Sequence, residues 1–329
     1  MSSAALKVAL TRRLPSQVEA RLVDLFDTRL HDSDAPLSPS ELIERANGAH
    51  VLAATLGDRL DETFFKNVGP DLKLIANFGA GVDHIDIDAA NGKGVIVTNT
   101  PSVLAEDAAD MAMALILAVP RRLVEGVAAL REGRFEGWSP TWMLGRRVRG
   151  RKLGVIGLGR VGEAIARRAR AFGLSIHYHN RSPINPHIEE ELDATYWESL
   201  DQMLARVDIV SVNCPHTPAT FHLLSRRRLE LMQRHAYLVN ISRGEIVDET
   251  ALADLIATGR LAGAGLDVYE RGGPNEKLLG LENVVLLPHM ASATEESRLE
   301  MGERVIINIK MFADGHKPPD RVILGLGRM

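Results

Sequence analysis

The chain of 329 residues has a single cysteine, Cys214, so it cannot form an internal disulfide bond. A lone thiol is typical of a reducing compartment, and we expect a cytoplasmic protein. The longest purely apolar run, Met111 to Val119, is shorter than the about 20 residues that a membrane helix needs. Residues 1–16 lack the apolar core of a signal peptide, so we expect neither secretion nor a membrane anchor.

An excess of positive charge is also missing. The 39 lysines and arginines are outnumbered by 43 aspartates and glutamates, which leaves a net charge of −4. This balance provides no general attraction for nucleic acid or an anionic membrane, so any anion must bind at a local site. The apolar share of 45% is that of an ordinary globular protein, and the length allows two domains.

A glycine motif lies near the middle of the chain. Residues 153–156 form a short apolar run typical of a buried strand, and Gly157, Gly159 and Gly162 follow it with the spacing G-x-G-x-x-G. An amphipathic pattern and a second strand-like run then predict a helix and a strand between residues 161 and 179. This order is typical of a dinucleotide site, in which the pyrophosphate lies at the helix N-terminus.

Strand-like and helical patterns alternate on both sides of this motif. The first hundred residues contain four strand-like runs separated by helical or turn segments, which predicts a parallel sheet. The same alternation continues after the motif to residue 287, and a last long helix covers residues 295–312. Because this helix follows the final strand, we expect it to return to the N-terminal unit. The sequence therefore predicts two α/β domains, one of residues 1–100 plus 291–329 and one of residues 101–290.

The alternation loosens between residues 126 and 150. Trp138 and Trp142 lie in this extended arm, and exposed indole side chains of this kind indicate an interface. Packing of both within one subunit is the alternative. The basic run at residues 146–152 is interpreted as a solvated turn before the buried strand, rather than as a phosphate site.

Five motifs, in the same order, resemble the D-isomer-specific 2-hydroxyacid dehydrogenase family. They are residues 77–84 (NFGAGVDH), 157–162 (GLGRVG), 240–248 (NISRGEIVD), 264–269 (AGLDVY) and 288–289 (PH). Within the family, residues 138–145 are similar to the arm of glyoxylate and hydroxypyruvate reductases. The resemblance implies a Rossmann-type coenzyme domain inserted into a split flavodoxin-like substrate domain, both doubly wound, with an active site in the cleft and a homodimer.

Arg243 and His289 supply the side chains that reduction of a 2-keto acid requires. A cation must bind the carboxylate and the keto oxygen, and a proton donor must serve the developing alkoxide. Both residues follow predicted strands, at the edge where α/β sheets bind ligands, and the role of His289 rests on its match to the family's histidine. The resemblance also implies that the N–H groups of Ala80 and Gly81 bind the carboxylate, and that Trp142 reaches the partner subunit's site and limits substrate size.

The end of the second strand of the glycine motif predicts NADPH as the preferred coenzyme, with NADH as a possible substitute. NAD enzymes place an acidic residue here, whereas this chain has Asn180, followed by Arg181 and Ser182 as a cation and a hydroxyl for the 2′-phosphate. Asp267 matches a contact to the nicotinamide amide. The complete expected coenzyme set is Gly157, Gly159, Arg160, Val161, Gly162, Asn180, Arg181, Ser182, Cys214, Pro215, Thr220, Ile241, Ser242 and Asp267.

One position departs from the family pattern. Family members carry a glutamate that bonds the catalytic histidine about 29 residues after the arginine, and Gly272 stands there in this chain. A carboxylate beside an imidazole favours its charged form, so the loss predicts a lowered pKa for His289. Either Glu270 replaces the missing carboxylate or the histidine works with water alone, and Glu276 is a more distant candidate.

The expected activity is NADPH-dependent reduction of glyoxylate, hydroxypyruvate or a similar small 2-keto acid to the D-2-hydroxy acid. A formate- or phosphite-oxidising relative is one alternative, which the tryptophan arm disfavours. A non-catalytic dinucleotide-sensing protein is the other, because the resemblance extends to transcriptional corepressors. We expect no metal site, since His177 and His179 alternate on a strand without a carboxylate or cysteine at ligand spacing.

Overall fold

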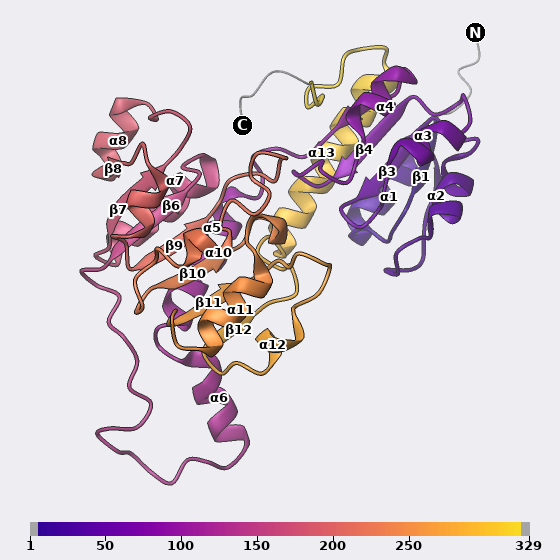
Figure 1. Cartoon of the computed structure of the whole chain (residues 1–329). Helices are drawn as coiled ribbons and strands as arrows, with labels where there is room; N and C mark the ends of the chain where they lie inside the picture. Colours follow the sequence, from indigo (N-terminus) through magenta and orange to yellow (C-terminus); the bar gives the residue numbers. More distant parts are fainter. Residues whose placement is uncertain (1–5, 324–329) are drawn as a thin grey trace. The chain divides into compact units, whose positions relative to one another are not determined.

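The computed structural model describes residues 6–323, and the chain divides into two compact units. Unit 1 runs up to Leu104 and resumes at Ala293, whereas unit 2 comprises Ala105–Ser292 (Figure 1). The chain passes from unit 1 to unit 2 after Leu104 and back to unit 1 after Ser292, in each case a few residues beyond the domain boundary expected from the sequence. Each unit has a parallel sheet covered by helices, so the predicted fold class is confirmed.

Unit 1 is built on a five-stranded parallel sheet with the order β2-β1-β3-β4-β5. The strands are β1 (Lys7–Leu10), β2 (Asp27–Arg29), β3 (Val51–Thr55), β4 (Leu74–Phe78) and β5 (Ile96–Thr98). The helices are α1 (Ser16–Leu25), α2 (Pro39–Ala46), α3 (Glu62–Asn67), α4 (Ile87–Gly92) and α13 (Glu295–Ala313). This strand order is that of flavodoxin-like sheets, whose strand order reverses between the first and third strands.

The start of α2 shows how local sequence signals become structure. Ser38 accepts a hydrogen bond from the Glu41 N–H, and the Glu41 carboxylate accepts one from the Ser38 N–H at 2.7 Å, which completes a capping box. Pro39 occupies the first helical position, where no donor is needed. The helix therefore begins at residues whose types favour a helix start.

Helix α13 belongs to unit 1 although it follows unit 2 in the sequence. It packs against β4 and α1, and a Cβ at Gly302 would lie only 2.2 Å from a methyl group of Val18, so this approach requires glycine. Beyond the helix, the backbone of Asp320 bonds the side chain of buried Asn308 at 3.1 Å, and the Val322 N–H bonds Val97 O on β5 at 2.9 Å. The expected return of the last helix to the N-terminal unit is thus seen.

Unit 2 is built on a seven-stranded parallel sheet with the order β12-β11-β10-β9-β6-β7-β8. The strands are β6 (Lys152–Ile156), β7 (Ser175–His179), β8 (Ala194–Tyr196), β9 (Ile209–Val212), β10 (Tyr237–Asn240), β11 (Gly263–Leu266) and β12 (Val284–Leu286). The helices are α5 (Ala105–Ala118), α6 (Leu123–Arg131), α7 (Arg160–Ala171), α8 (Pro186–Leu192), α9 (Leu200–Leu204), α10 (Arg226–Leu229), α11 (Glu249–Ala257) and α12 (Glu276–Leu279), with a 3₁₀ turn at η1 (Gly244–Ile246).

The two faces of this sheet bury separate cores. Val155 and Ile209 pack among α5 and α7 on one face, whereas the next residue of each strand, Ile156 and Val210, packs among α9, α10 and α11 on the other. Near-continuous apolar strands are expected when both faces of a parallel sheet are covered. The strand order reverses between β6 and β9, which is where doubly wound sheets bind their ligands.

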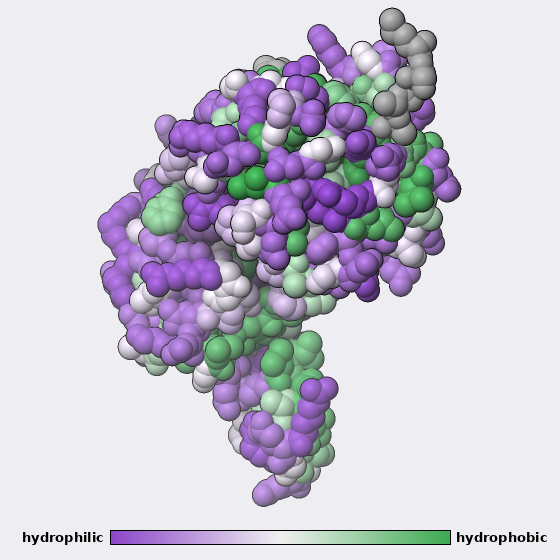
Figure 2. All heavy atoms as spheres, turned by 90° about the vertical axis from the view of Figure 1, so that its right-hand side faces the viewer, coloured by the Kyte–Doolittle hydropathy of each residue, from purple (hydrophilic) through white to green (hydrophobic). Residues whose placement is uncertain are grey.

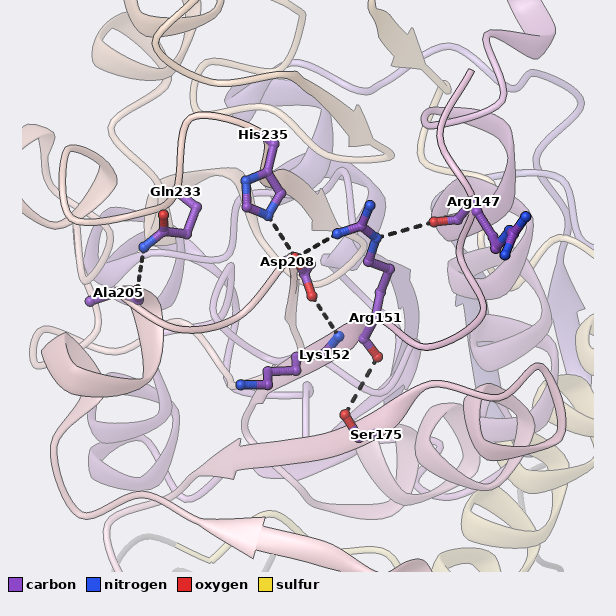
Figure 3. Close-up of polar contacts among 8 residues, drawn as sticks. All are labelled: Arg147, Arg151, Lys152, Ser175, Ala205, Asp208, Gln233 and His235. Atoms are coloured by element: carbon purple, nitrogen blue, oxygen red, sulfur yellow. Dashed lines mark hydrogen bonds and ion pairs between the residues drawn. The ribbon is translucent and has the colours of Figure 1, made fainter. Parts of the chain in front are cut away.

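The amino ends of β6, β9 and β10 are joined by one carboxylate (Figure 3). Asp208 accepts hydrogen bonds from the Lys152 N–H at 2.8 Å and from His235 Nε2 at 2.6 Å, and Arg151 lies 3.4 Å away. The backbone carbonyl of Arg147 accepts a hydrogen bond from Arg151 Nε at 3.3 Å. The basic run before β6 therefore contributes one ion pair to the sheet edge opposite the glycine motif.

Helix α6 was not predicted from the sequence. Its apolar side chains lie outside, with Leu123 59% and Leu130 63% exposed, so the helix has no buried stripe of the kind that periodicity detects. Figure 2 shows hydrophobic residues on the lower protrusion formed by α6 and the arm that follows it. Among residues 6–323, none of the helices combines the length and the hydropathy needed to span a bilayer.

Candidate functional site

The three glycines of the motif have three different surroundings. Gly157 has φ +91°, and a Cβ there would lie 2.6 Å from the Cys214 N atom. A Cβ at Gly162 would lie 2.5 Å from Gly157 O, so the helix can approach the strand only with glycine. Gly159 faces open space, with no atom within 4 Å of a Cβ. The loop therefore combines a tight turn, close packing and room for a ligand.

The N-terminus of α7 lies directly behind this open position. Gly159 is its N-cap, and none of the side chains among residues 6–323 caps this end of the helix. Exposed Arg160 and half-buried Val161 form the start of the first turn. Uncapped N–H groups and the helix dipole attract an anion, so this end fits a coenzyme pyrophosphate.

Asn180, at the end of β7, holds the glycine loop in place. Its Oδ1 accepts a hydrogen bond from the Leu158 N–H at 2.7 Å, and its Nδ2 donates to Leu158 O at 3.3 Å. The amide expected at the 2′-phosphate is thus engaged by the loop. Arg181 and Ser182 are exposed, and among the described residues Arg181 has no acidic partner.

The loop after β9 forms the other wall of the site. Cys214 packs against Gly157, and its burial raises the pKa of the thiol to about 11, so the side chain stays neutral. Thr220 Oγ1 donates a hydrogen bond to Pro215 O at 2.7 Å and accepts one from the Thr217 N–H at 2.8 Å. Register pairs Ile156 with Val212, so β6 and β9 end side by side and bring these two loops together.

The turn that carries Arg243 is shaped by buried Asn240. The Asn240 side chain accepts a hydrogen bond from the Ser242 N–H at 3.0 Å and donates one to Arg243 O at 2.8 Å. A Cβ at Gly244 would lie 2.0 Å from the carbonyl carbon of Tyr269, so the turn rests on the loop after β11. Ile241 is buried within this turn. Arg243 is therefore held at the carboxyl end of β10.

His289 lies just after β12 on a backbone fixed by Asp267. His289 is exposed and has φ +55°, an uncommon conformation for a residue other than glycine. The fully buried Asp267 carboxylate accepts hydrogen bonds from the Met290 N–H at 2.7 Å and the Ala291 N–H at 2.8 Å. Asp267 thus orients the segment that carries His289, and its expected contact to the nicotinamide amide stays a prediction.

Glu270, one of the candidates to replace the missing glutamate, is directed elsewhere. Glu270 Oε1 lies 2.9 Å from His222 Nε2 and forms an ion pair with it when that histidine is protonated. Gly272 has φ +76°, and a Cβ there would have open space around it. Glu276 is exposed at the start of α12. The question that the sequence left open therefore has a partial answer, since Glu270 bonds His222.

In unit 1, two asparagines shape the loop expected to bind the substrate carboxylate. Asn77 Nδ2 donates to Gly79 O and to Gly81 O, each at 2.9 Å, and Asn99 Nδ2 donates to Ala80 O at 2.7 Å. Among the described residues, the N–H groups of Ala80 and Gly81 have no hydrogen-bond acceptor. Two adjacent N–H donors of this kind suit an anion.

The remaining histidines and tryptophans have separate surroundings. His177 Nδ1 accepts a hydrogen bond from Trp197 Nε1 at 3.1 Å, and burial lowers the pKa of His177, while His179 contacts the Trp197 carbonyl at 2.8 Å. Residues 6–323 contain no cluster of three metal-ligating side chains. The two tryptophans of the arm differ in their surroundings. Trp142 stacks on Phe135 with 5.6 Å between the ring centroids, whereas Trp138 is 86% exposed.

Five polar residues that shape these loops were not predicted as site residues, namely Asn77, Asn99, His222, Asn240 and Glu249. Asn77 and Asn240 had a detectable signal, because each is a polar residue within an apolar strand that ends in a family motif. His222 and Glu249 had none, since their partners are brought near only by the fold.

The fold and the loop geometry define a dinucleotide-binding α/β enzyme. The chain belongs to the D-isomer specific 2-hydroxyacid dehydrogenase family, whose NAD binding domain matches residues 113–291. It is 41% identical over 319 residues to the glyoxylate reductase of Korarchaeum cryptofilum, covering 96% of this chain and 95% of that protein. The glyoxylate reductase of Thermococcus litoralis is 40% identical over 321 residues, with 96% of each chain covered.

A solved structure agrees with this assignment. The NADPH-dependent glyoxylate/hydroxypyruvate reductase of Sinorhizobium meliloti, in complex with NADP and malonate, superposes with a TM-score of 0.82 at 35% identity and 97% coverage of each chain. Family membership makes this chain an oxidoreductase that uses a nicotinamide dinucleotide and acts on a small keto or hydroxy acid. The suspected family is thereby confirmed.

Proposed function

We propose that the protein reduces glyoxylate, hydroxypyruvate or a similar small 2-keto acid to the D-2-hydroxy acid with NADPH. The observation that carries this proposal is the pair Arg243 and His289, each held on a fixed turn at the carboxyl edge of the sheet that bears the glycine loop. Relatives named glyoxylate reductase, at 41% and 40% identity, support the substrate class.

The glycine loop and α7 fit the coenzyme, which supplies the hydride when it is bound. Open space at Gly159 admits the pyrophosphate, and the uncapped first turn of α7, including Arg160 and Val161, offers N–H groups to it. Cys214, Pro215 and Thr220 line the facing loop. Ile241 and Ser242 precede Arg243 on the next loop of the same edge.

Arg243 and His289 have different proposed roles toward the substrate. The planar guanidinium of Arg243 suits the carboxylate and keto oxygen together and stabilises the negative charge that develops on that oxygen. His289 donates the proton that completes the alcohol. The N–H groups of Ala80 and Gly81 are the proposed further donors to the substrate carboxylate.

The coenzyme preference rests on the end of β7. No acidic residue stands at Asn180, and Arg181 and Ser182 are exposed beside it. An exposed cation next to a hydroxyl attracts the 2′-phosphate, whereas NAD enzymes carry an acid that would repel it. Asn180 contributes by holding the glycine loop, and NADPH is the proposed preferred coenzyme.

The arm is the proposed contact with a second copy of the chain. Trp138 is 86% exposed and Trp142 is 39% exposed, and α6 adds exposed leucines to the same protrusion. An exposed apolar surface of this extent marks an interface, and a twofold homodimer is the commonest closed assembly. We propose that Trp142 limits substrate size in the partner subunit's site.

The test is a panel of keto acids measured with both coenzymes. Turnover of NADPH with glyoxylate or hydroxypyruvate, with a higher kcat/KM than with NADH, supports the proposal. Oxidation of formate or phosphite without keto acid reduction overturns the substrate class. Tight coenzyme binding with no turnover of any of these compounds indicates a sensor instead.

A further inference from the structure

Three loops at the carboxyl edge of the unit 2 sheet meet at His222. The residue lies in the loop after β9, its N–H donates to Glu245 O at 2.8 Å in the turn after β10, and its ring bonds Glu270 in the loop after β11. The ring also stacks on Phe221, with 4.2 Å between centroids and 10° between planes. Backbone and side chain of His222 thus each bind a different neighbouring loop.

The loop that carries Glu270 is itself fixed at both ends by Glu249. This carboxylate, 6% exposed at the start of α11, accepts hydrogen bonds from the Glu270 N–H at 2.9 Å and from the Asn275 N–H at 2.5 Å. Gly244 packs against the Tyr269 carbonyl from the other side. The position of Glu270 is therefore defined relative to the turn that carries Arg243.

We infer that His222 is a positioning residue for the reaction, and that its pair with Glu270 locks the coenzyme loop after β9 to the Arg243 turn. The inference rests on the proposed function, because it takes Pro215 and Thr220 as coenzyme contacts and Arg243 as the substrate contact. The His222–Glu270 hydrogen bond is partly buried, and a hydrogen bond to a charged partner is one of the stronger single links between loops. Loss of the pair leaves both loops free to shift, so NADPH and the keto acid both bind more weakly.

The same geometry separates Glu270 from proton transfer. Its carboxylate is bonded to His222, and its backbone is fixed by Glu249, so Glu270 acts through loop position. Removing its charge should therefore change KM values and leave the pH dependence of kcat unchanged. A carboxylate that served the proton donor would show the opposite result.

The experiment compares His222→Ala, Glu270→Ala and the double variant by kcat and by KM for NADPH and glyoxylate. We expect each single variant to raise both KM values about fivefold with kcat within about twofold, and the double variant to add nothing further. His222→Gln, which keeps a donor at similar reach, should restore most of the loss. Glu230→Gln, an exposed carboxylate directly after α10, is the matched control and should resemble the wild type.

Additive effects in the double variant, or unchanged KM values, overturn the inference. A shifted pH profile of kcat in Glu270→Gln would assign Glu270 to the proton donor instead. If a variant with alanine does not fold, as judged by its thermal transition, Glu270→Gln decides, because removal of the charge should still raise both KM values. Wild-type protein without keto acid turnover contradicts the proposed function alone, and the loop coupling is then measured by the Kd for NADPH from tryptophan fluorescence.

Discussion

At the scale of single residues, the site depends on side chains that form hydrogen bonds with the main chain of its loops. Asn180, Asn240 and Asp267 each bond the main chain of a loop that carries a functional residue, at distances between 2.7 and 3.3 Å. A buried polar group that is fully bonded fixes one arrangement, since the alternatives leave it unsatisfied. In the proposed function, Arg243 and His289 carry out the chemistry, while their placement is distributed over residues that need not touch substrate.

The residue beside the proposed 2′-phosphate site gives a direct test of coenzyme choice. Arg181→Ala removes an exposed cation, and we expect the NADPH to NADH ratio of kcat/KM to fall about tenfold, because a charge-assisted contact to a phosphate is lost while the ribose contacts remain. Steady-state kinetics with both coenzymes measure the ratio. Arg170→Ala, at the far end of α7, is a suitable control. An unchanged ratio in Arg181→Ala removes this residue from the 2′-phosphate site.

Substitution of His289 tests the chemical step separately from coenzyme binding. His289→Ala should lower kcat at least about a hundredfold, since a positioned proton donor contributes that much, with the Kd for NADPH nearly unchanged. Turnover assays and fluorescence titration measure the two quantities. His187→Ala, an exposed histidine on α8, should behave as wild type. Full activity in His289→Ala would refute its assignment as proton donor.

At the scale of elements, the strands and the main helices could be predicted because their apolar patterns are strong. The short edge strands β2 and β8 could not, since three residues with polar members carry too little periodicity. Helix α6 was missed because its apolar side chains face outward. The Glu270 contact was beyond reach for another reason: it joins residues 48 apart in the sequence, so its partner is chosen by the fold.

The amino edge of the unit 2 sheet carries a pH-dependent contribution to stability. Burial alone would raise the pKa of Asp208, but the Lys152 N–H, His235 and Arg151 together lower it. A folded pKa below the unfolded value means that the stabilisation is present above about pH 4 and is lost as the pH falls through the folded pKa. Asp208 therefore stabilises the joined strands of Figure 3 at neutral pH.

Asp208→Asn tests this contribution. We expect a loss of about 1 kcal/mol in the free energy of unfolding at pH 7, because the partly exposed charge-assisted bonds are weakened, and a smaller difference from wild type at pH 3. Urea denaturation at the two pH values gives both numbers. Asp110→Asn removes an exposed partner of Arg168 and should cost little at either pH. Equal losses at pH 7 and pH 3 would show that the charge of Asp208 does not matter.

At the scale of the whole molecule, the arm is the segment whose apolar side chains a single chain leaves exposed to water. Each unit has its own buried cores, yet the segment from α6 to Trp142 exposes leucine, phenylalanine and tryptophan side chains together. Scattered apolar residues are normal on a surface, but a continuous group of this kind is costly in water. A second copy of the chain offers an identical surface and therefore a self-complementary contact.

The resulting prediction is a homodimer whose stability depends on the arm. Light scattering at micromolar concentration should give twice the chain mass, and Trp138→Ala should raise the dimer Kd about tenfold or more, since buried tryptophans are frequent anchors of interfaces. Phe172→Ala, an exposed aromatic at the end of α7, should leave the dimer intact. Trp142→Ala should additionally improve kcat/KM for bulkier keto acids relative to glyoxylate, because Trp142 is the proposed limit on substrate size. A monomer at these concentrations, together with an unchanged substrate preference in Trp142→Ala, would show that the arm serves neither assembly nor specificity.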